Sequence, residues 1–344
     1  MQHSKTHAPA RRRAIVVVAA VLSTVGVLGA CADPVGTGTT GPVDPKALGD
    51  SKVLPVSFDT SAHAKRPAGI LHPEIAATLP ADVKARDTLV IGSGGAGGGI
   101  PPLAFTADDN RTPIGVEVDV AHLVADVLGL EADVRTTSWE NLFIGIDSGA
   151  YQVAISNVGV SEERKEKYDF ATYRLGLHAF EAKKGSTLQV RGPADVSGRK
   201  VAVGSGTLQE AILLRWNEEN AKAGRPPAEL VYYQGTTEYY LALDSGRIDL
   251  YLGPNPTATY HVVTAGKTQI VGTVSSSFPI PGKVGVLTKK DNGLVKPISD
   301  AINAAIADGS YGKVLARWGL TAEAVPTSEV NPAGLPKPTE TSDQ

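Results

Sequence analysis

The stretch that decides the fold is residues 139–173, WENLFIGIDSGAYQVAISNVGVSEERKEKYDFATY. Its start has apolar residues at the spacing of one buried helix face, namely Leu142, Phe143 and Ile146. Gly149 stands where helices commonly end. Residues 151–156 are rich in β-branched and aromatic side chains. The stretch therefore predicts a helix, a glycine stop and a short strand in succession.

A polar turn, SEERKEKYDF, follows the strand and carries Arg164. Ser161 can cap a helical turn that contains this arginine. An arginine just beyond a buried strand can present a rigid bidentate fork to a carboxylate. The alternative is a solvated turn with pairs such as Glu163–Lys167, and composition alone favours that interpretation.

The whole stretch resembles family 3 of the bacterial extracellular solute-binding proteins, which are the polar-amino-acid-binding proteins of ATP-binding-cassette (ABC) importers. The motifs that carry the resemblance are Trp139–Leu142, Ser148–Gln152, Ile155–Ser156, Ser161–Arg164 and Asp169–Tyr173. The resemblance implies that Arg164 binds the α-carboxylate of the ligand. It also implies that Trp139 packs against the ligand's side chain.

The fold implied by the resemblance is α/β, the two-lobe type II periplasmic-binding-protein-like fold. Each lobe has a central β-sheet flanked by helices, and the ligand cleft lies between the lobes. The expected lobes are residues 86–177 plus 279–325 for lobe 1 and residues 178–278 for lobe 2. Two crossovers, near residues 174–177 and 278–283, form the hinge. Residues 238–260 repeat the helix–SGxxD–strand order, so lobe 2 is expected to echo lobe 1.

The first 30 residues predict a signal peptide, because a basic start precedes an apolar run at residues 14–30. Leu28–Cys31 resembles the bacterial lipobox, which implies cleavage before Cys31 and diacylation of that cysteine. The alternative is an uncleaved anchor with an incidental cysteine. We therefore expect a lipid-anchored protein on the extracytoplasmic face of the cell membrane.

The two ends of the chain are rich in polar residues, glycine and proline. Residues 31–85 predict a flexible tether and an N-terminal extension, with a short helix or two within residues 72–84. Residues 326–344 are polar and predict a disordered tail.

Composition excludes several classes of protein. Hydrophobic residues make up 42% and charged residues 20% of the chain, as in a globular protein. Without the leader, 29 Lys and Arg face 36 Asp and Glu, and this acidic balance argues against nucleic-acid binding. We expect a monomer.

No pattern for catalysis, cofactor or metal emerges. Gly92, Gly94 and Gly97 match G-x-G-x-x-G formally, but Pro101 and Pro102 oppose the helix that a dinucleotide site needs. The histidines are scattered, which argues against a metal site. We expect no cofactor and no enzyme activity.

A second anion-binding element is expected at residues 206–210, where a glycine turn opens a helix. The resemblance assigns this turn to the same carboxylate. Thr207 matches the family pattern, whereas Leu208 stands where the family has Thr or Ser. Gly159 likewise replaces a Ser or Thr beside the carboxylate.

The ligand's ammonium group has no obvious partner. Pro254 stands where the family places an ammonium-binding Asp. Glu140, Asn157 and Asn255 are candidate contacts, and each also fits a structural or solvated role. The sequence therefore predicts a small carboxylate-bearing solute, and favours an acid without a free α-ammonium. The rival hypothesis is an ordinary amino acid whose ammonium is bound by Glu140.

The expected function is solute capture by hinge closure, followed by delivery to an ABC permease in the membrane. Two alternatives remain open. One is an exported enzyme that resembles cyclohexadienyl dehydratases, which would need an acid in the cleft to protonate a leaving group. The other is a ligand-sensing subunit of a membrane receptor.

Overall fold

The computed structural model describes residues 58–96, 99–233 and 235–338. The expected signal peptide, Cys31 and the tether up to residue 57 lie outside these ranges. Among the described helices, none combines the length and apolarity needed to cross a membrane.

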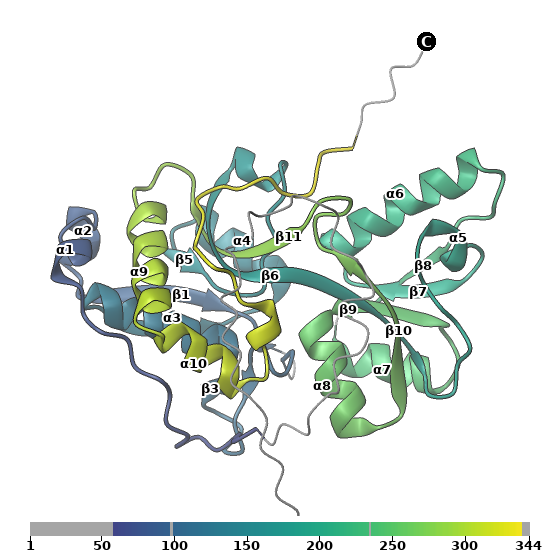
Figure 1. Ribbon diagram of the computed structural model, residues 1–344, viewed down its shortest axis with the longest axis horizontal. Helices are drawn as coiled ribbons and strands as arrows, with labels where there is room; N and C mark the ends of the chain where they lie inside the picture. Colours follow the sequence, from purple (N-terminus) through teal and green to yellow (C-terminus); the bar gives the residue numbers. More distant parts are fainter. Residues whose placement is uncertain (1–57, 97–98, 234, 339–344) are drawn as a thin grey trace, which may run out of the picture. The chain divides into compact units, whose positions relative to one another are not determined.

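One long strand, β6 (Tyr168–Lys183), connects the two halves of the fold (Figure 1). Its first part pairs antiparallel with β11 (Gly282–Lys289) as far as Gly176. Beyond that residue it pairs with β9 (Leu250–Pro254) and β10 (Thr268–Ser275). The change of partner falls within the crossover predicted at residues 174–177.

The first half, called lobe 1 below, has the strand order β4–β1–β5–β11–β6. The bounds are Thr88–Ser93 for β1, Glu131–Thr136 for β4 and Val153–Ala154 for β5. Helices α3 (Val116–Leu128), α9 (Val295–Ala307) and α10 (Ser310–Arg317) share one apolar cluster with the sheet. Helix α4 (Trp139–Asp147) belongs to a second cluster. Val153 joins the first cluster and Ala154 the second, so the helices cover opposite faces of the sheet.

Local sequence signals in this half are largely confirmed. Gly149 follows α4 with φ 76°, the left-handed conformation of a helix stop. The strand predicted over residues 151–156 is shorter, because only Val153 and Ala154 pair. Asp119 in the first turn of α3 fastens this helix to the end of α10. Its Oδ2 accepts hydrogen bonds from Trp318 and Arg317 at 2.7 and 2.8 Å.

The second half, called lobe 2 below, has the strand order β6–β9–β7–β8, with β10 on the other edge of β6. Its strands β7 (Lys200–Val203) and β8 (Glu229–Tyr232) are parallel. The helices are α5 (Pro193–Val196), α6 (Leu208–Lys222), α7 (Thr236–Asp244) and α8 (Asn255–Ala265). The helix–strand repeat predicted at residues 238–260 is present as α7 followed by β9.

Short elements complete the described chain. They are α1 (Pro73–Ala76), α2 (Ala81–Lys84), β2 (Phe105–Thr106), β3 (Pro113–Ile114), and the 3-10 turns η3 (Arg164–Glu166) and η4 (Thr321–Glu323).

Residues 326–338, which we call the strap, pack against both lobes. The sequence prediction of a disordered tail is therefore wrong for these residues. The Leu335 amide donates to the Val160 carbonyl at 2.9 Å in lobe 1. Its side chain, 5% exposed, belongs to the lobe 2 cluster around Trp216. Arg215 of α6 donates to the Pro336 carbonyl at 2.9 Å. Composition suggested a solvated tail, but one apolar side chain and a few backbone bonds fix it across both lobes.

We predict that Leu335→Ala lowers the free energy of unfolding by ~2–4 kcal/mol, because it empties a buried apolar position. Val330→Ala is the matched control, since Val330 is in the same strap but 40% exposed. The control should change stability by less than about 0.5 kcal/mol. Urea denaturation measures both, and equal effects would contradict a buried role for Leu335.

Candidate functional site

Arg164 opens the turn η3, where Ser161 caps it as predicted. The Arg164 amide donates to Ser161 Oγ at 3.1 Å. The guanidinium donates to two backbone carbonyls, Gly159 at 2.9 Å and Gly206 at 3.1 Å. Gly159 belongs to lobe 1 and Gly206 to lobe 2. The arginine therefore lies where both lobes meet, directly before the first turn of α6.

Two aromatic rings of α4 pack against the same guanidinium. Its Cζ lies 5.2 Å from the ring centroid of Trp139 and 5.4 Å from that of Phe143. Removal from water lowers the pKa of Arg164 to about 10, and the charge of Glu163 acts in the opposite direction. The side chain is still protonated at neutral pH. Within the described ranges it forms no ion pair, so its charge is available to an anionic ligand.

Gly159 and Leu208, which both lack the hydroxyl of the family pattern, lie in contact. A Cβ added to Gly159 would lie 2.5 Å from Leu208 Cδ1. Leu208 is buried in the lobe 2 apolar cluster with Trp216. The two departures are therefore one change in packing: leucine occupies the space that a side chain at position 159 would need.

Thr207 is the N-cap of α6. Its hydroxyl accepts from the Glu210 amide at 3.2 Å and donates to the Gly204 carbonyl at 2.7 Å. Glu210 in turn accepts from the Gly206 amide at 2.6 Å. This arrangement fixes the helix start in the manner of a capping box. The Thr207 hydrogen is thus engaged within the protein, and what the helix start can offer an anion is backbone N–H.

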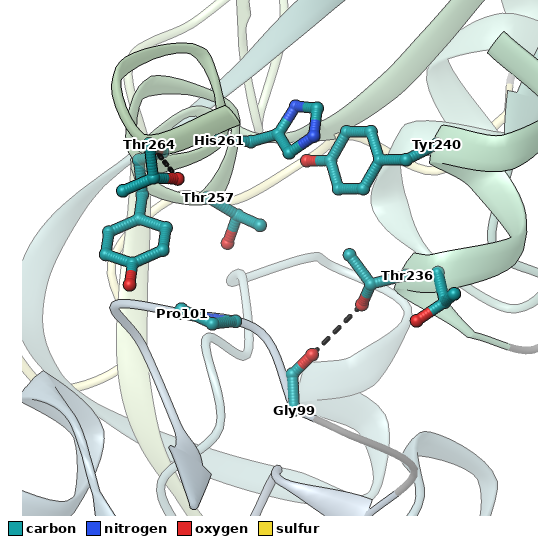
Figure 2. Close-up of a pocket in the computed structure, with 9 residues that line it drawn as sticks. Gly99, Pro101, Thr236, Tyr240, Thr257, His261 and Thr264 are labelled. Atoms are coloured by element: carbon teal, nitrogen blue, oxygen red, sulfur yellow. Dashed lines mark hydrogen bonds between the residues drawn. The ribbon is translucent and has the colours of Figure 1, made fainter. Parts of the chain in front are cut away.

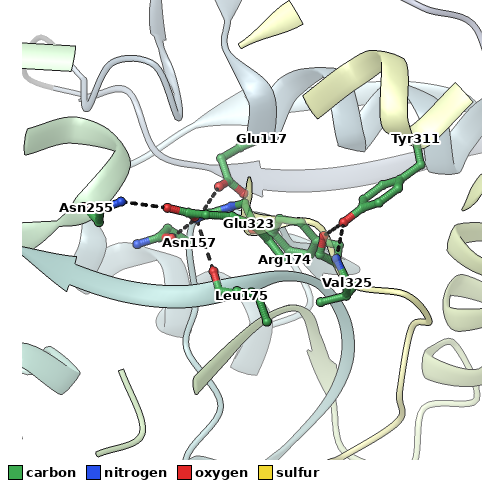
Figure 3. A network of polar contacts seen from close by, with 9 residues as sticks. Glu117, Asn157, Arg174, Leu175, Asn255, Tyr311, Glu323 and Val325 are labelled. Carbon is green, nitrogen blue, oxygen red and sulfur yellow. Dashed lines mark hydrogen bonds and ion pairs between the residues drawn. The ribbon is translucent and has the colours of Figure 1, made fainter. Parts of the chain in front are cut away.

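The other predicted contacts divide into two kinds. Glu140 is exposed on the first turn of α4. Asn157 and Asn255 instead belong to a buried polar network centred on Arg174, which Figure 3 shows. Asn157 accepts a hydrogen bond from Arg174, and Asn255 donates to Glu323 at 3.1 Å.

The Arg174 network is the main feature of this region that sequence reasoning missed. Arg174 is fully buried and pairs with Glu117 of α3 at 3.3 Å and with Glu323 of η4. Tyr173 donates to Glu117. Burial raises the pKa of Glu117, against the opposing charge of Arg174. Asn255 begins α8 in lobe 2, so the network links α3, β6, η4 and α8.

A separate cavity of about 210 Å³ lies between Pro101 and helices α7 and α8 (Figure 2). The Thr236 hydroxyl donates to the Gly99 carbonyl at 3.0 Å beside it. The rings of Tyr240 and His261 stack at 3.4 Å between centroids. None of the predicted ligand residues lines this cavity. We place the candidate site at Arg164, because a cation that has no ion pair among the described residues lies there beside the start of α6.

No metal-binding cluster of three His, Cys, Asp or Glu side chains is found in the described part of the chain.

We predict that Arg174→Met destabilises the ligand-free protein by ~3–5 kcal/mol, because two buried carboxylates lose their counter-charge. Arg164→Met should change stability by only about 1 kcal/mol, because Arg164 forms no ion pair in the described ranges. Urea denaturation compares the two. Equal losses would show that Arg174 is not a structural ion-pair centre.

Known proteins match most of this chain in sequence. The family model of bacterial extracellular solute-binding proteins, family 3, matches residues 94–321. The L-cystine-binding protein TcyJ of Escherichia coli K12 is 32% identical over 238 residues, which are 69% of this chain and 84% of that protein. The arginine-binding protein ArgT of Corynebacterium glutamicum is 26% identical over 251 residues, covering 72% of this chain and 79% of the relative.

A solved structure shares the fold. The amino acid ABC transporter substrate-binding protein AbpA of Streptococcus pneumoniae, bound to L-arginine, superposes with a TM-score of 0.60 at 20% identity. The match covers 70% of this chain and 99% of that one. On the extent of the family match and the identity to TcyJ, this chain belongs to the bacterial extracellular solute-binding proteins of family 3.

Proposed function

We propose that the protein is the lipid-anchored substrate-binding subunit of an ABC importer. It captures a small carboxylate-bearing solute, an amino acid or a related compound, by hinge closure. The observation that carries this proposal is Arg164, a protonated guanidinium that forms no ion pair in the described ranges and is hydrogen-bonded to one carbonyl from each lobe. A carboxylate bound there contacts both lobes at once and so stabilises the closed arrangement.

The surroundings of Arg164 support the same ligand class. The backbone at the start of α6 presents N–H groups and the positive end of the helix dipole. Trp139 and Phe143 offer an apolar surface for the rest of the solute. The named relatives bind cystine and arginine, which are carboxylate-bearing solutes.

The lipid anchor and the permease complete the proposal. Anchoring rests on the lipobox-like Leu28–Cys31, and export on the leader that precedes it. An anchored receptor keeps the solute close to the permease that it serves. We also propose that the protein acts as a monomer.

We predict that Arg164→Ala weakens solute binding about 30-fold or more, the effect expected when the partner of a buried charge is removed. Arg164→Lys should be nearly as damaging, because a lysine lacks the bidentate fork. Calorimetric titration with L-arginine, L-cystine and their N-acetylated forms measures the change. Affinity of Arg164→Ala within threefold of wild type would rule out the carboxylate contact.

A further prediction concerns the ammonium group. Pro254 offers neither a carboxylate nor an N–H, and Asn255 donates to Glu323 instead. We predict that N-acetylated amino acids bind more tightly than the free ones, because an unpaired ammonium resists desolvation. Titration of both sets decides. Micromolar binding of a free amino acid that is lost in Glu140→Gln would refute this prediction and support the rival role of Glu140.

A further inference from the structure

His178 is a buried histidine on the hinge strand that has no partner in the described structure. It lies two residues beyond the point where β6 changes partners, opposite Pro254 on β9 and Val274 on β10. The residue is 4% exposed, and neither ring nitrogen forms a hydrogen bond to any described residue. Buried polar atoms in folded proteins are almost always paired, so two unpaired nitrogens on one side chain need an explanation.

Strand alternation shows which face His178 occupies. Side chains on one face of a strand recur at every second residue, so His178 shares its face with Phe180. On the neighbouring strand, Pro254 likewise shares its face with Leu252. Phe180, Leu252 and Leu208 belong to one apolar cluster under α6. His178 therefore lies at the hinge end of this face, on the side of the sheet where α6 begins.

Shared neighbours put the ring on the Arg164 side of the sheet. Leu208 of the same apolar cluster lies against Gly159, whose carbonyl accepts a hydrogen bond from Arg164. Burial, and after it the charges of Arg164 and Arg174, lowers the pKa of the His178 imidazole to about 3. The ring is therefore neutral at physiological pH.

We propose that His178 contacts the ligand, donating a ring N–H to an uncharged oxygen next to the carboxylate that Arg164 binds. This rests on the proposed function, and it names the ligand class more closely: a carboxylic acid whose α-carbon carries an acylamino, hydroxyl or oxo group. The positive charge of Arg164 at the same candidate site favours an acceptor oxygen over an ammonium. The proline opposite His178 adds no donor or acid of its own.

The experiment compares His178→Leu, which keeps the side-chain volume but removes both nitrogens, with His178→Gln, which keeps a hydrogen-bond donor. His122→Leu on α3 is the matched control, because His122 is also a neutral histidine, with a pKa of about 4, outside the Arg164 site. Each protein is titrated with N-acetyl-L-arginine, N,N′-diacetyl-L-cystine, L-arginine and L-cystine. Thermal unfolding of each ligand-free protein is recorded as well.

We expect His178→Leu to weaken binding of the N-acetylated probes about tenfold, His178→Gln to recover part of it, and His122→Leu to have no effect. Ligand-free His178→Leu should melt no lower than wild type, because it removes two unpaired buried polar atoms. Binding of His178→Leu within threefold of wild type would overturn the proposal. So would a fall in its melting temperature of more than about 4 °C, which would mark the imidazole as a structural group.

The same data separate this proposal from the one on which it rests. If Arg164→Ala abolishes binding while His178→Leu binds normally, only the role of His178 is wrong. If wild type binds none of the four probes, the proposed ligand class is wrong. The unfolding of ligand-free His178→Leu then still decides whether the imidazole has a structural role.

Discussion

The ion pairs of Arg174 are the constraint on which the rest of the structure depends. A guanidinium with no exposed surface must have carboxylate partners, and it finds them in Glu117 and Glu323. These partners come from a helix near the start of the described fold and a turn near its end. Tyr173 and Asn255 complete the hydrogen bonding. One buried cation thereby fixes β6 against α3, η4 and the first turn of α8.

This constraint also positions the candidate site. Arg174 holds β6 within a few residues of the crossover, where the strand changes partners after Gly176. Arg164 lies on the turn that leads into the same strand, and His178 lies just beyond the crossover. A displacement of β6 would move both groups. Arg174, which is structural, and Arg164, the proposed ligand contact, thus lie on one continuous stretch of chain.

Local signals in the sequence predicted much of this arrangement. Three of these signals are local: Ser161 caps a turn, Gly149 ends α4 and Thr207 begins α6. Each residue acts on backbone within four residues of itself, so the sequence pattern alone reveals it. The partners of Arg174 cannot be found that way. Glu117 and Glu323 are 57 and 149 residues distant along the chain. Only the folded chain brings them together.

His178 and the strap were missed for other physical reasons. A histidine in a buried strand looks like any core residue until its hydrogen bonds are counted. The strap is mostly polar, and composition reports the average of a segment rather than the burial of one leucine. The proposed role of Arg164 rests on a family resemblance, because the sequence by itself favoured a solvated turn.

The contact between Gly159 and Leu208 has a consequence for how the candidate site can change. Adding a hydroxyl-bearing side chain at position 159 alone would drive it into Leu208. Replacing Leu208 alone by threonine would leave the space above Gly159 partly empty and place a hydroxyl in an apolar cluster. Each substitution is unfavourable without the other, so the two positions are epistatic. A path from this site to one with two hydroxyls has to pass through a poorly packed intermediate or change both residues together.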